Sequence, residues 1–309
     1  MEFIDTASMD GKAQCMNSPM HDRCLLCNGA LLKPLNRYSK ILLVKCARCG
    51  FVFSQAIPAE NELIRHYNLY GRNDYLSPVT VKRYHEILDY LEKFRKTNRL
   101  MDVGCGIGYF LEVAKERNWE VYGTEFTQAA VQICRKKGIE TQQGKLDPEN
   151  YLPASFDVIT SFEVIEHINY PIQEMKNFRQ LLREGGAVYI TTPNFHSVSK
   201  FLLKEKWNIL VYPEHLCYYT PNTISALFEN TGFSNLKMET TGISTSRIKE
   251  SLANVQSHCN TRSSDDEKLR TMLEANRFKR GLKSFINRIL TFLYIGDSIK
   301  AVFVRDSFR

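Results

Sequence analysis

The sequence has 309 residues, of which 43% are hydrophobic and 24% charged, with 41 Lys and Arg against 34 Asp and Glu. The apolar content is sufficient for a folded core and excludes disorder over most of the chain, while the net charge of +7 fits an anionic substrate or an acidic surface without requiring a nucleic acid. No apolar run reaches the roughly 18 residues that a membrane span needs, and residues 1–20 contain no apolar signal-peptide core, so we expect a cytoplasmic protein.

The first 55 residues are predicted to form a short tail and a small zinc-binding module. Residues 1–20 are polar and aperiodic, which is typical of a flexible tail. Residues 21–55 hold Cys24-Leu-Leu-Cys27 and Cys46-Ala-Arg-Cys49, two pairs that lie eighteen residues apart around an apolar, strand-like run. Four thiolates at this spacing indicate a closed, structural zinc ribbon, and the alternatives are reduced thiols or an iron–sulfur centre.

The basic residues of this module leave its role open. Zinc ribbons often contact nucleic acid, but lysines that simply face solvent produce the same pattern. We regard the solvent-facing interpretation as the simpler one. The residues concerned are Lys33, Arg37, Lys40, Lys45 and Arg48.

The remainder of the chain is predicted to be an α/β domain with a helical lead-in. Residues 56–98 are expected to form a helical connector or lid, with helices at 62–67 and 79–95. Across 99–309, short apolar strands alternate with helices, the pattern of a doubly wound, mainly parallel seven-stranded sheet, here with an insertion at 243–298. The predicted strands are 100–103, 120–123, 139–142, 156–161, 187–191, 236–240 and 299–304.

A glycine-rich loop follows the first predicted strand, in Leu100-Met-Asp-Val-Gly-Cys-Gly-Ile-Gly-Tyr109. Gly104, Gly106 and Gly108 let the backbone turn tightly and approach a ligand, and the helix that starts near Gly108 directs free N–H groups at an anionic group. In an open α/β sheet this loop lies at the ligand-binding edge. Tyr109 stands where a dinucleotide fingerprint needs its third glycine, which argues against a nicotinamide cofactor.

Two acidic residues accompany this loop. With Asp102 two residues before the first glycine, the string resembles the first motif of class I S-adenosylmethionine-dependent methyltransferases. The resemblance implies a Rossmann-like methyltransferase fold, S-adenosylmethionine as cofactor, and a place for Asp102 near its amino group. Glu125, at the end of the second strand, offers two acceptor oxygens for the ribose hydroxyls. The alternative is that Glu125 is an ordinary surface carboxylate.

A second group of polar residues follows the fourth predicted strand. Phe162 and Glu163 lie where this fold places residues beside the cofactor. If residues 163–167 form a helix or turn, Glu163, Glu166 and His167 share one face. Two carboxylates and an imidazole suit a divalent ion, while local hydrogen bonding of Glu166 and His167 is the alternative.

The segment Tyr212–Asn222 follows the fifth strand by about the distance needed to fold back over the pocket, which makes His215 a candidate fourth ligand or general base. The strings Glu-Val-Ile-Glu-His and Glu-His-Leu resemble those of ubiquinone-biosynthesis O-methyltransferases and small-RNA 2′-O-methyltransferases. The resemblance implies that Glu163, Glu166, His167 and His215 hold a divalent ion near the substrate hydroxyl. As an alternative, a neutral His167 or His215 removes the hydroxyl proton directly.

Residues 278–293 are predicted to form an amphipathic helix. One apolar stripe runs from Phe278 to Leu293, and four basic residues lie off it: Lys279, Arg280, Lys283 and Arg288. Such a helix packs on the sheet or over the pocket. The alternative is peripheral contact with a membrane, which would suit a lipid-linked substrate.

Taken together, these patterns predict O-methylation of a small-molecule, sugar or glycan hydroxyl, with S-adenosylmethionine, a structural zinc and a candidate second divalent ion as cofactors. The order of zinc module, helix and methyltransferase domain resembles bacterial enzymes that modify sugars of natural products and cell-surface glycans. One alternative is an RNA methyltransferase that uses the zinc ribbon for recognition, although no aromatic-plus-basic cluster accompanies it. Another is a non-catalytic cofactor-binding protein, which the intact Asp102, Gly104 and Glu125 disfavour.

Overall fold

The computed structural model describes residues 19–59, 62–63, 66, 76–243, 248 and 277–307. Most of the predicted tail, half of the predicted 62–67 helix, and residues 244–247 and 249–276 of the predicted insertion lie outside these residues. Within the described ranges, no helix is both long and apolar enough to cross a bilayer.

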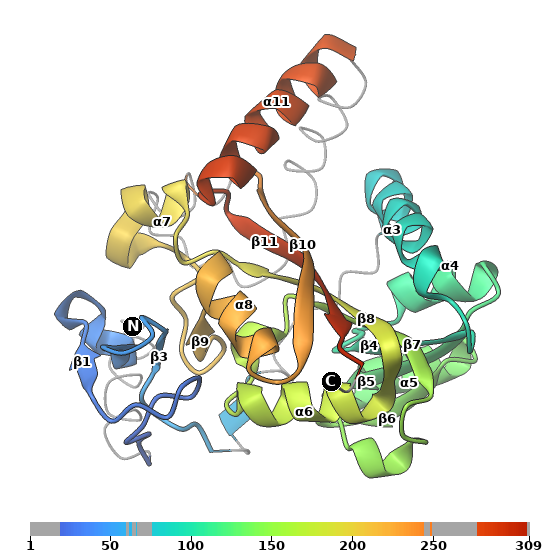
Figure 1. The fold of residues 1–309 in the computed structure, drawn as a ribbon, viewed down its shortest axis with the longest axis horizontal. Coiled ribbons are helices and arrows are strands. Elements are labelled where there is room, and N and C mark those ends of the chain that lie inside the picture. The colour runs from blue at the N-terminus through green and yellow to red at the C-terminus, as the bar shows by residue number, and fades with distance from the viewer. Residues whose placement is uncertain are drawn as a thin grey trace, which may run out of the picture.

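A seven-stranded sheet forms the centre of the molecule (Figure 1). Its strands are β4 (Arg99–Val103), β5 (Glu120–Glu125), β6 (Glu140–Gln143), β7 (Phe156–Phe162), β8 (Leu182–Pro193), β10 (Phe233–Thr241) and β11 (Ser298–Arg305). Their order across the sheet is β10-β11-β8-β7-β4-β5-β6. The five strands from β8 to β6 are parallel, and β11 runs antiparallel to both of its neighbours. The predicted mainly parallel, seven-stranded sheet is therefore confirmed.

Helices cover both faces of the sheet, as a parallel sheet requires. One face packs against α3 (Pro78–Leu91), α4 (Tyr109–Glu116) and α5 (Gln128–Lys136), and the other against α6 (Pro171–Leu181) and α8 (Pro221–Glu229). Alternate strand residues divide between the two cores. Leu100 and Val158 belong to the first, whereas their neighbours Met101 and Ile159 belong to the second. The near-continuous apolar runs read from the sequence thus correspond to strands buried on both sides.

The cysteine module forms a second, smaller sheet. Its strands β1 (Leu32–Pro34), β2 (Leu43–Cys46) and β3 (Val52–Ser54) are joined by η1 (Asn36–Ile41), and all three pair antiparallel. The fourth strand comes from far along the chain, because β9 (Cys217–Tyr218) pairs with β3. In Figure 1 the N-terminal strands lie beside β9, away from the central sheet. This connection was not predicted from the sequence.

The C-terminal part of the chain adds two further helical segments. They are α7 (Val198–Leu203), continued by η5 (Lys204–Lys206), and α11 (Arg277–Leu293), which contains the predicted 278–293 helix. Hydrogen bonds tie the end of α11 to the sheet: the Thr240 hydroxyl donates to the Leu290 carbonyl oxygen at 2.7 Å, and the Thr291 hydroxyl donates to the Thr240 carbonyl oxygen at 2.9 Å. The helix therefore projects from a fixed point above the edge of the sheet (Figure 1).

Candidate functional site

The glycine loop lies between the end of β4 and the start of α4. Its three glycines have positive φ angles of 75°, 55° and 81° at Gly104, Gly106 and Gly108, a conformation that other residues rarely adopt. A Cβ atom on Gly104 would overlap the side chain of Val164, whereas one on Gly106 would have no atom within 4 Å. The loop is therefore packed against the chain after β7 on one side and open at Gly106, as close approach of a ligand requires.

Glu125 ends β5 beside this loop. One carboxylate oxygen accepts a hydrogen bond of 3.0 Å from the Gly106 N–H, and the other accepts bonds of 2.9 and 3.0 Å from the N–H and hydroxyl of Thr127. The carboxylate thus joins the second strand to the glycine loop. Thr127, which sequence reasoning missed, fixes its orientation.

Asp102 is buried at the end of β4, with only 3% of its surface exposed. Its carboxylate accepts a hydrogen bond of 2.7 Å from the Thr160 hydroxyl. Burial raises the pKa of Asp102 to about 8, and the negative potential of Cys134 and Glu125 contributes in the same direction. A cationic group beside Asp102 would offset this cost. The carboxylate and the open backbone at Gly106 therefore fit a ligand that carries an ammonium group.

Phe162, predicted to lie beside the cofactor, belongs to an aromatic cluster under α3. Its ring centroid lies 4.9 Å from that of Phe110 and 5.6 Å from that of Tyr189. Tyr84 on α3 contacts the same cluster, and burial, together with the nearby Asp102, raises its pKa to about 12. These aromatic side chains close one side of the loop against water.

A compact polar cluster includes Glu166 and His167, which follow Val164 closely in the sequence. Within the described residues, one ligand atom from each of Glu166, His167 and His215 lies within 4.8 Å of the others. The two imidazole rings have centroids 4.8 Å apart. The turn η4 (Ile165–His167) presents the first two residues, and the segment before β9 presents His215. The structure thus brings together three of the four residues that the sequence suggested as ligands.

The carboxylate of Glu163 is not part of this cluster, although its backbone carbonyl oxygen lies 3.1 Å from Nε2 of His167. Its φ angle is 54°, and the turn begins only at Ile165, so the predicted shared face does not form. Its carboxylate lies 3.4 Å from the Ser298 hydroxyl, which donates to it. Glu163 directly follows β7 and precedes Val164, whose side chain packs against Gly104.

Backbone carbonyl groups orient both histidines. Nδ1 of His167 lies 2.6 Å from the Glu214 carbonyl oxygen, and Nδ1 of His215 lies 2.6 Å from that of Ile209. Burial, reinforced by His215, lowers the pKa of His167 to about 3, so its imidazole is neutral at pH 7. When Nδ1–H of His215 donates to its carbonyl partner, Nε2 of His215 carries a lone pair, which is the tautomer that a metal-binding histidine adopts. His167 has a carbonyl oxygen at each ring nitrogen, because its Nε2 lies 3.1 Å from the Glu163 carbonyl oxygen.

Acidic and imidazole groups that the sequence analysis did not single out surround this cluster. The Glu214 carboxylate lies 3.6 Å from Nε2 of His215 and 3.5 Å from Nε2 of His66. The Thr192 hydroxyl donates to the Glu166 carboxylate at 2.9 Å. Glu214 precedes His215 directly and could have been noticed on that ground, whereas nothing in the sequence near His66 indicates this contact.

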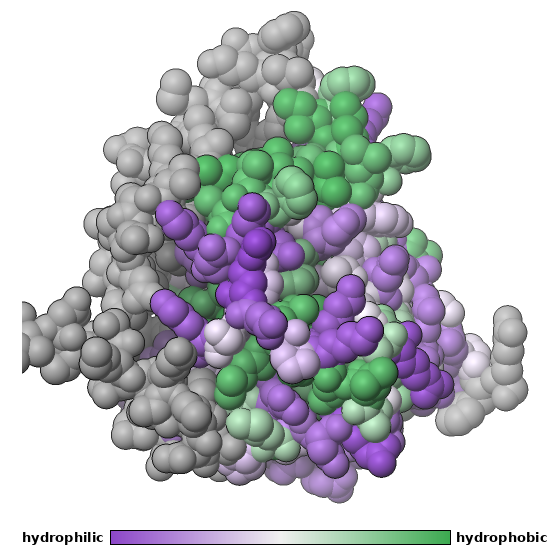
Figure 2. All heavy atoms as spheres, turned by 90° about the vertical axis from the view of Figure 1, so that its left-hand side faces the viewer, coloured by the Kyte–Doolittle hydropathy of each residue, from purple (hydrophilic) through white to green (hydrophobic). Residues whose placement is uncertain are grey.

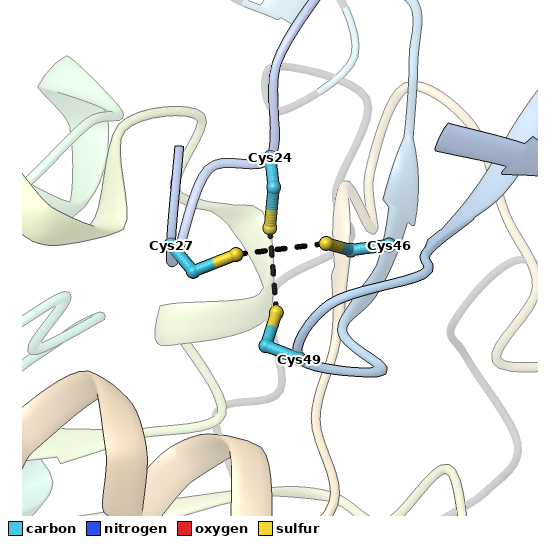
Figure 3. Close-up of side chains that lie close together, drawn as sticks. All are labelled: Cys24, Cys27, Cys46 and Cys49. Carbon is cyan, nitrogen blue, oxygen red and sulfur yellow. Dashed lines mark hydrogen bonds between the residues drawn. The ribbon is translucent and has the colours of Figure 1, made fainter. Parts of the chain in front are cut away.

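The four cysteines of the ribbon converge on one point (Figure 3). The sulfur atoms of Cys24 and Cys49 lie 3.5 Å apart, as do those of Cys27 and Cys46. A tetrahedron with metal–sulfur bonds of about 2.3 Å has sulfur–sulfur edges of about 3.8 Å, so the cluster is close to the size of a zinc site. Burial alone would raise the pKa of Cys46, but bonds from the backbone of Cys49 and Arg48 outweigh it and hold that pKa at about 7. The donor set therefore fits zinc.

Comparison with known proteins identifies the relatives of this chain. A family model described as a methyltransferase domain matches residues 75–238. A ubiquinone biosynthesis O-methyltransferase from Idiomarina loihiensis is 29% identical over 131 residues, covering 40% of this chain and 51% of the relative. One from Nitrosococcus oceani is 33% identical over 103 residues, covering 31% and 44%. The chain thus spans about half the length of the curated relatives it matches.

Among solved structures, a cyclase named SpnF superimposes with a TM-score of 0.50 at 16% identity, covering 81% of this chain and 97% of that one, which is a similarity of fold alone. The family match extends over more than half of this chain and includes the glycine loop, Glu125 and the Glu166–His167 turn. The chain therefore belongs to the methyltransferase domain family and has the Rossmann-like fold of class I S-adenosylmethionine-dependent methyltransferases.

Proposed function

We propose that this protein transfers a methyl group from S-adenosylmethionine to a hydroxyl oxygen of a small-molecule or glycan acceptor. The observation that carries the proposal is the contact between Val164 and Gly104, because it places the Glu166–His167 turn directly beside the glycine loop. When bound, S-adenosylmethionine supplies an activated methyl group on a sulfonium. The residues of this chain then have to bind it, exclude water, align the acceptor and receive a proton.

In this proposal, Asp102 and Glu125 hold the two polar ends of the cofactor. Asp102 binds the ammonium group, which favours its ionised form, and Glu125 accepts hydrogen bonds from the ribose hydroxyls. The backbone at Gly104, Gly106 and Gly108 lies along the methionine part. Phe162 and its aromatic neighbours keep water away from the reacting groups.

The polar cluster receives the acceptor hydroxyl. A pKa near 3 makes His167 alone a weak base at pH 7. This favours a divalent ion held by Glu166, His167 and His215, which would lower the pKa of the acceptor hydroxyl when bound. The Ile209 carbonyl oxygen at Nδ1 of His215 leaves Nε2 of that residue for the ion, whereas Nε2 of His167 would exchange its contact with the Glu163 carbonyl oxygen for the ion.

In the ribbon, we propose one structural zinc on Cys24, Cys27, Cys46 and Cys49. All four ligands are sulfur, so no position is left for a substrate. The ribbon then contributes to the site through β3 and β9 and takes no part in the chemistry.

The proposal is tested with S-adenosylmethionine labelled on its methyl group and a low-molecular-weight and glycan extract, followed by mass spectrometry of the labelled product. We expect an O-methylated product. Label on nitrogen or carbon, or in RNA, would overturn the assignment of the acceptor.

Variants of the two histidines test the site itself. His167→Ala and His215→Ala should each lower turnover by about 10²-fold or more and leave cofactor affinity within about twofold. The exposed His196→Ala serves as the matched control. Full turnover in both site variants would rule out a role for the cluster. Calorimetric titration with Mn²⁺ separates the two mechanisms, because a metal site loses binding in Glu166→Gln whereas a simple base predicts no binding in the parent protein.

A further inference from the structure

An apolar surface forms where α7 meets the end of α11. On α7, the side chains of Phe201 and Leu202 are 76% and 61% exposed, and on α11 that of Phe292 is 83% exposed. Figure 2 shows apolar atoms gathered over the upper part of this side of the molecule. We call this set the apolar ridge; its members are Phe201, Leu202, Phe285, Ile286, Ile289, Phe292, Leu293 and Tyr294.

The ridge has a defined geometry, because hydrogen bonds join two distant segments of the chain beneath it. The Val198 N–H donates to the Ile295 carbonyl oxygen at 3.0 Å, and the Asn194 side-chain amide donates to the carbonyl oxygens of Tyr294 and Gly296 at 3.0 and 2.8 Å. The Ser199 hydroxyl donates to the Asp297 carboxylate at 2.7 Å. The start of α7 and the end of α11 therefore have one fixed relative position.

The exposed apolar residues of α11 form a stripe at positions 285, 286, 289, 292 and 293, the spacing of one helical face. Leu290, at the border of this stripe, is 5% exposed and packs inward. The helix is held to the protein by Leu290 and by hydrogen bonds of Asn287 and Thr291, and its apolar stripe is left exposed. Soluble proteins rarely expose a contiguous patch of this kind unless something binds it.

A basic border lies next to the ridge. Residues 21–55 and 198–206, which make up the ribbon, α7 and η5, contain nine Lys and Arg against two acids. Lys204 and Lys206 are exposed and follow the α7 part of the ridge directly. Burial lowers the pKa of Lys200, and the nearby cations Arg37 and Lys45 lower it further. Basic side chains from α7, η1 and β2 therefore lie close to one another. In Figure 2 the hydrophilic region lies directly below the apolar one.

We propose that the apolar ridge and its basic border bind the surface of a bilayer that contains anionic lipids, with the ridge in the boundary between headgroups and acyl chains. The aromatic and aliphatic side chains fit the apolar side of that boundary, and the lysines meet the lipid phosphates. A second copy of the chain fits less well, because its own basic border would face this one. RNA would pair with the lysines and leave Phe201 and Phe292 exposed to water.

This proposal is independent of the methyl transfer, since none of the residues assigned to the cofactor or the polar cluster belongs to the ridge. The test is flotation of the full chain with vesicles of phosphatidylcholine alone, or with about 30% phosphatidylglycerol, in about 0.1 M NaCl. We expect binding to the anionic vesicles only. Two double variants should each weaken it at least tenfold: Phe201→Ser with Leu202→Ser, and Lys204→Glu with Lys206→Glu.

Matched controls lie on other surfaces. Leu152→Ser removes a leucine that is 68% exposed, against 61% for Leu202, and Lys96→Glu with Lys136→Glu makes the same change in charge at exposed positions. All should bind vesicles as the parent protein does. Absence of binding by the parent protein, or equal loss in the controls, overturns the proposal.

Other occupants of the ridge give different results. A dimer in gel filtration that the Phe201→Ser, Leu202→Ser variant converts to a monomer would assign the surface to a second copy. RNA binding without vesicle binding, lost only in the lysine variant, would assign the border to nucleic acid. Coverage by another part of the chain would lower Tm by several degrees in the apolar variant, whereas a lipid-facing ridge leaves Tm within about 2 °C. Each of these outcomes would overturn the bilayer proposal.

Discussion

The backbone of Leu216 joins the ribbon to the polar cluster. Its N–H donates to the carbonyl oxygen of Glu166, and its own carbonyl oxygen accepts from the N–H of Ser54, both at 2.8 Å. Ser54 ends β3, whose start lies three residues after Cys49. A short run of backbone hydrogen bonds thus leads from the cysteines through β9 to the turn that presents Glu166 and His167.

This connection predicts that removal of zinc disturbs the polar cluster more than the cofactor loop. In Cys46→Ser with Cys49→Ser, zinc content should fall from about one per chain to near zero. Amide hydrogen exchange should then accelerate in peptides covering residues 212–220, while peptides covering 100–125 keep their protection. Cys259→Ser, outside the four-cysteine pattern, is the control. Equal protection at 212–220 with and without zinc would show that the ribbon does not support the loop.

Glu125 is predicted to contribute to cofactor affinity directly and through the loop. Glu125→Ala removes the proposed acceptor of the ribose hydroxyls and also the acceptor of the Gly106 N–H. Two lost hydrogen bonds to a charged group should weaken binding of S-adenosylmethionine by more than tenfold in calorimetry. The control is Glu120→Ala, at the exposed start of the same strand, which should stay within about twofold. Unchanged affinity in Glu125→Ala would exclude the ribose assignment.

The sheet and the glycine turn after β4 were predicted well because both depend on short-range patterns. Short apolar runs predict strands, and the spacing of Gly104, Gly106 and Gly108 after Asp102 predicts the tight turn between β4 and α4. The pairing of β3 with β9 was missed, since a two-residue strand has no periodicity and its partner is over 150 residues away. Glu163 was misplaced because nothing in its residue type indicates a positive φ.

The hydrogen bonds of Asp157 are not evident from sequence patterns, and we predict that they contribute to the free energy of unfolding. Its fully buried carboxylate accepts the N–H groups of Lys96, Thr97 and Asn98 at 2.7–2.8 Å and binds the Arg183 guanidinium at 2.5 Å. Asp157→Ala leaves these donors unpaired and should lower the free energy of unfolding by about 3–5 kcal/mol. Glu120→Ala, which breaks the exposed ion pair with Arg99, should cost less than about 1 kcal/mol. Urea denaturation measures both, and equal effects would contradict a special role for Asp157.

Asp102 provides a prediction about protons. Its pKa of about 8 in the cofactor-free protein lies above the ordinary value of 3.8, so at pH 7 the carboxyl group is mostly protonated. Between these two values the native state holds more protons than the unfolded chain. The contribution of protonated Asp102 to the free energy of unfolding is therefore fully present below about pH 4 and is lost as the pH rises toward 8.

An ammonium group placed beside Asp102 reverses the preference and favours the ionised carboxylate. Binding of S-adenosylmethionine at pH 7 should therefore release a substantial fraction of one proton, which calorimetry in two buffers of different ionisation enthalpy measures. Asp102→Asn preserves the size of the side chain and its position beside Thr160, cannot ionise, and should release close to none. The same proton release in the parent protein and the variant would show that the cation of the cofactor does not lie beside Asp102.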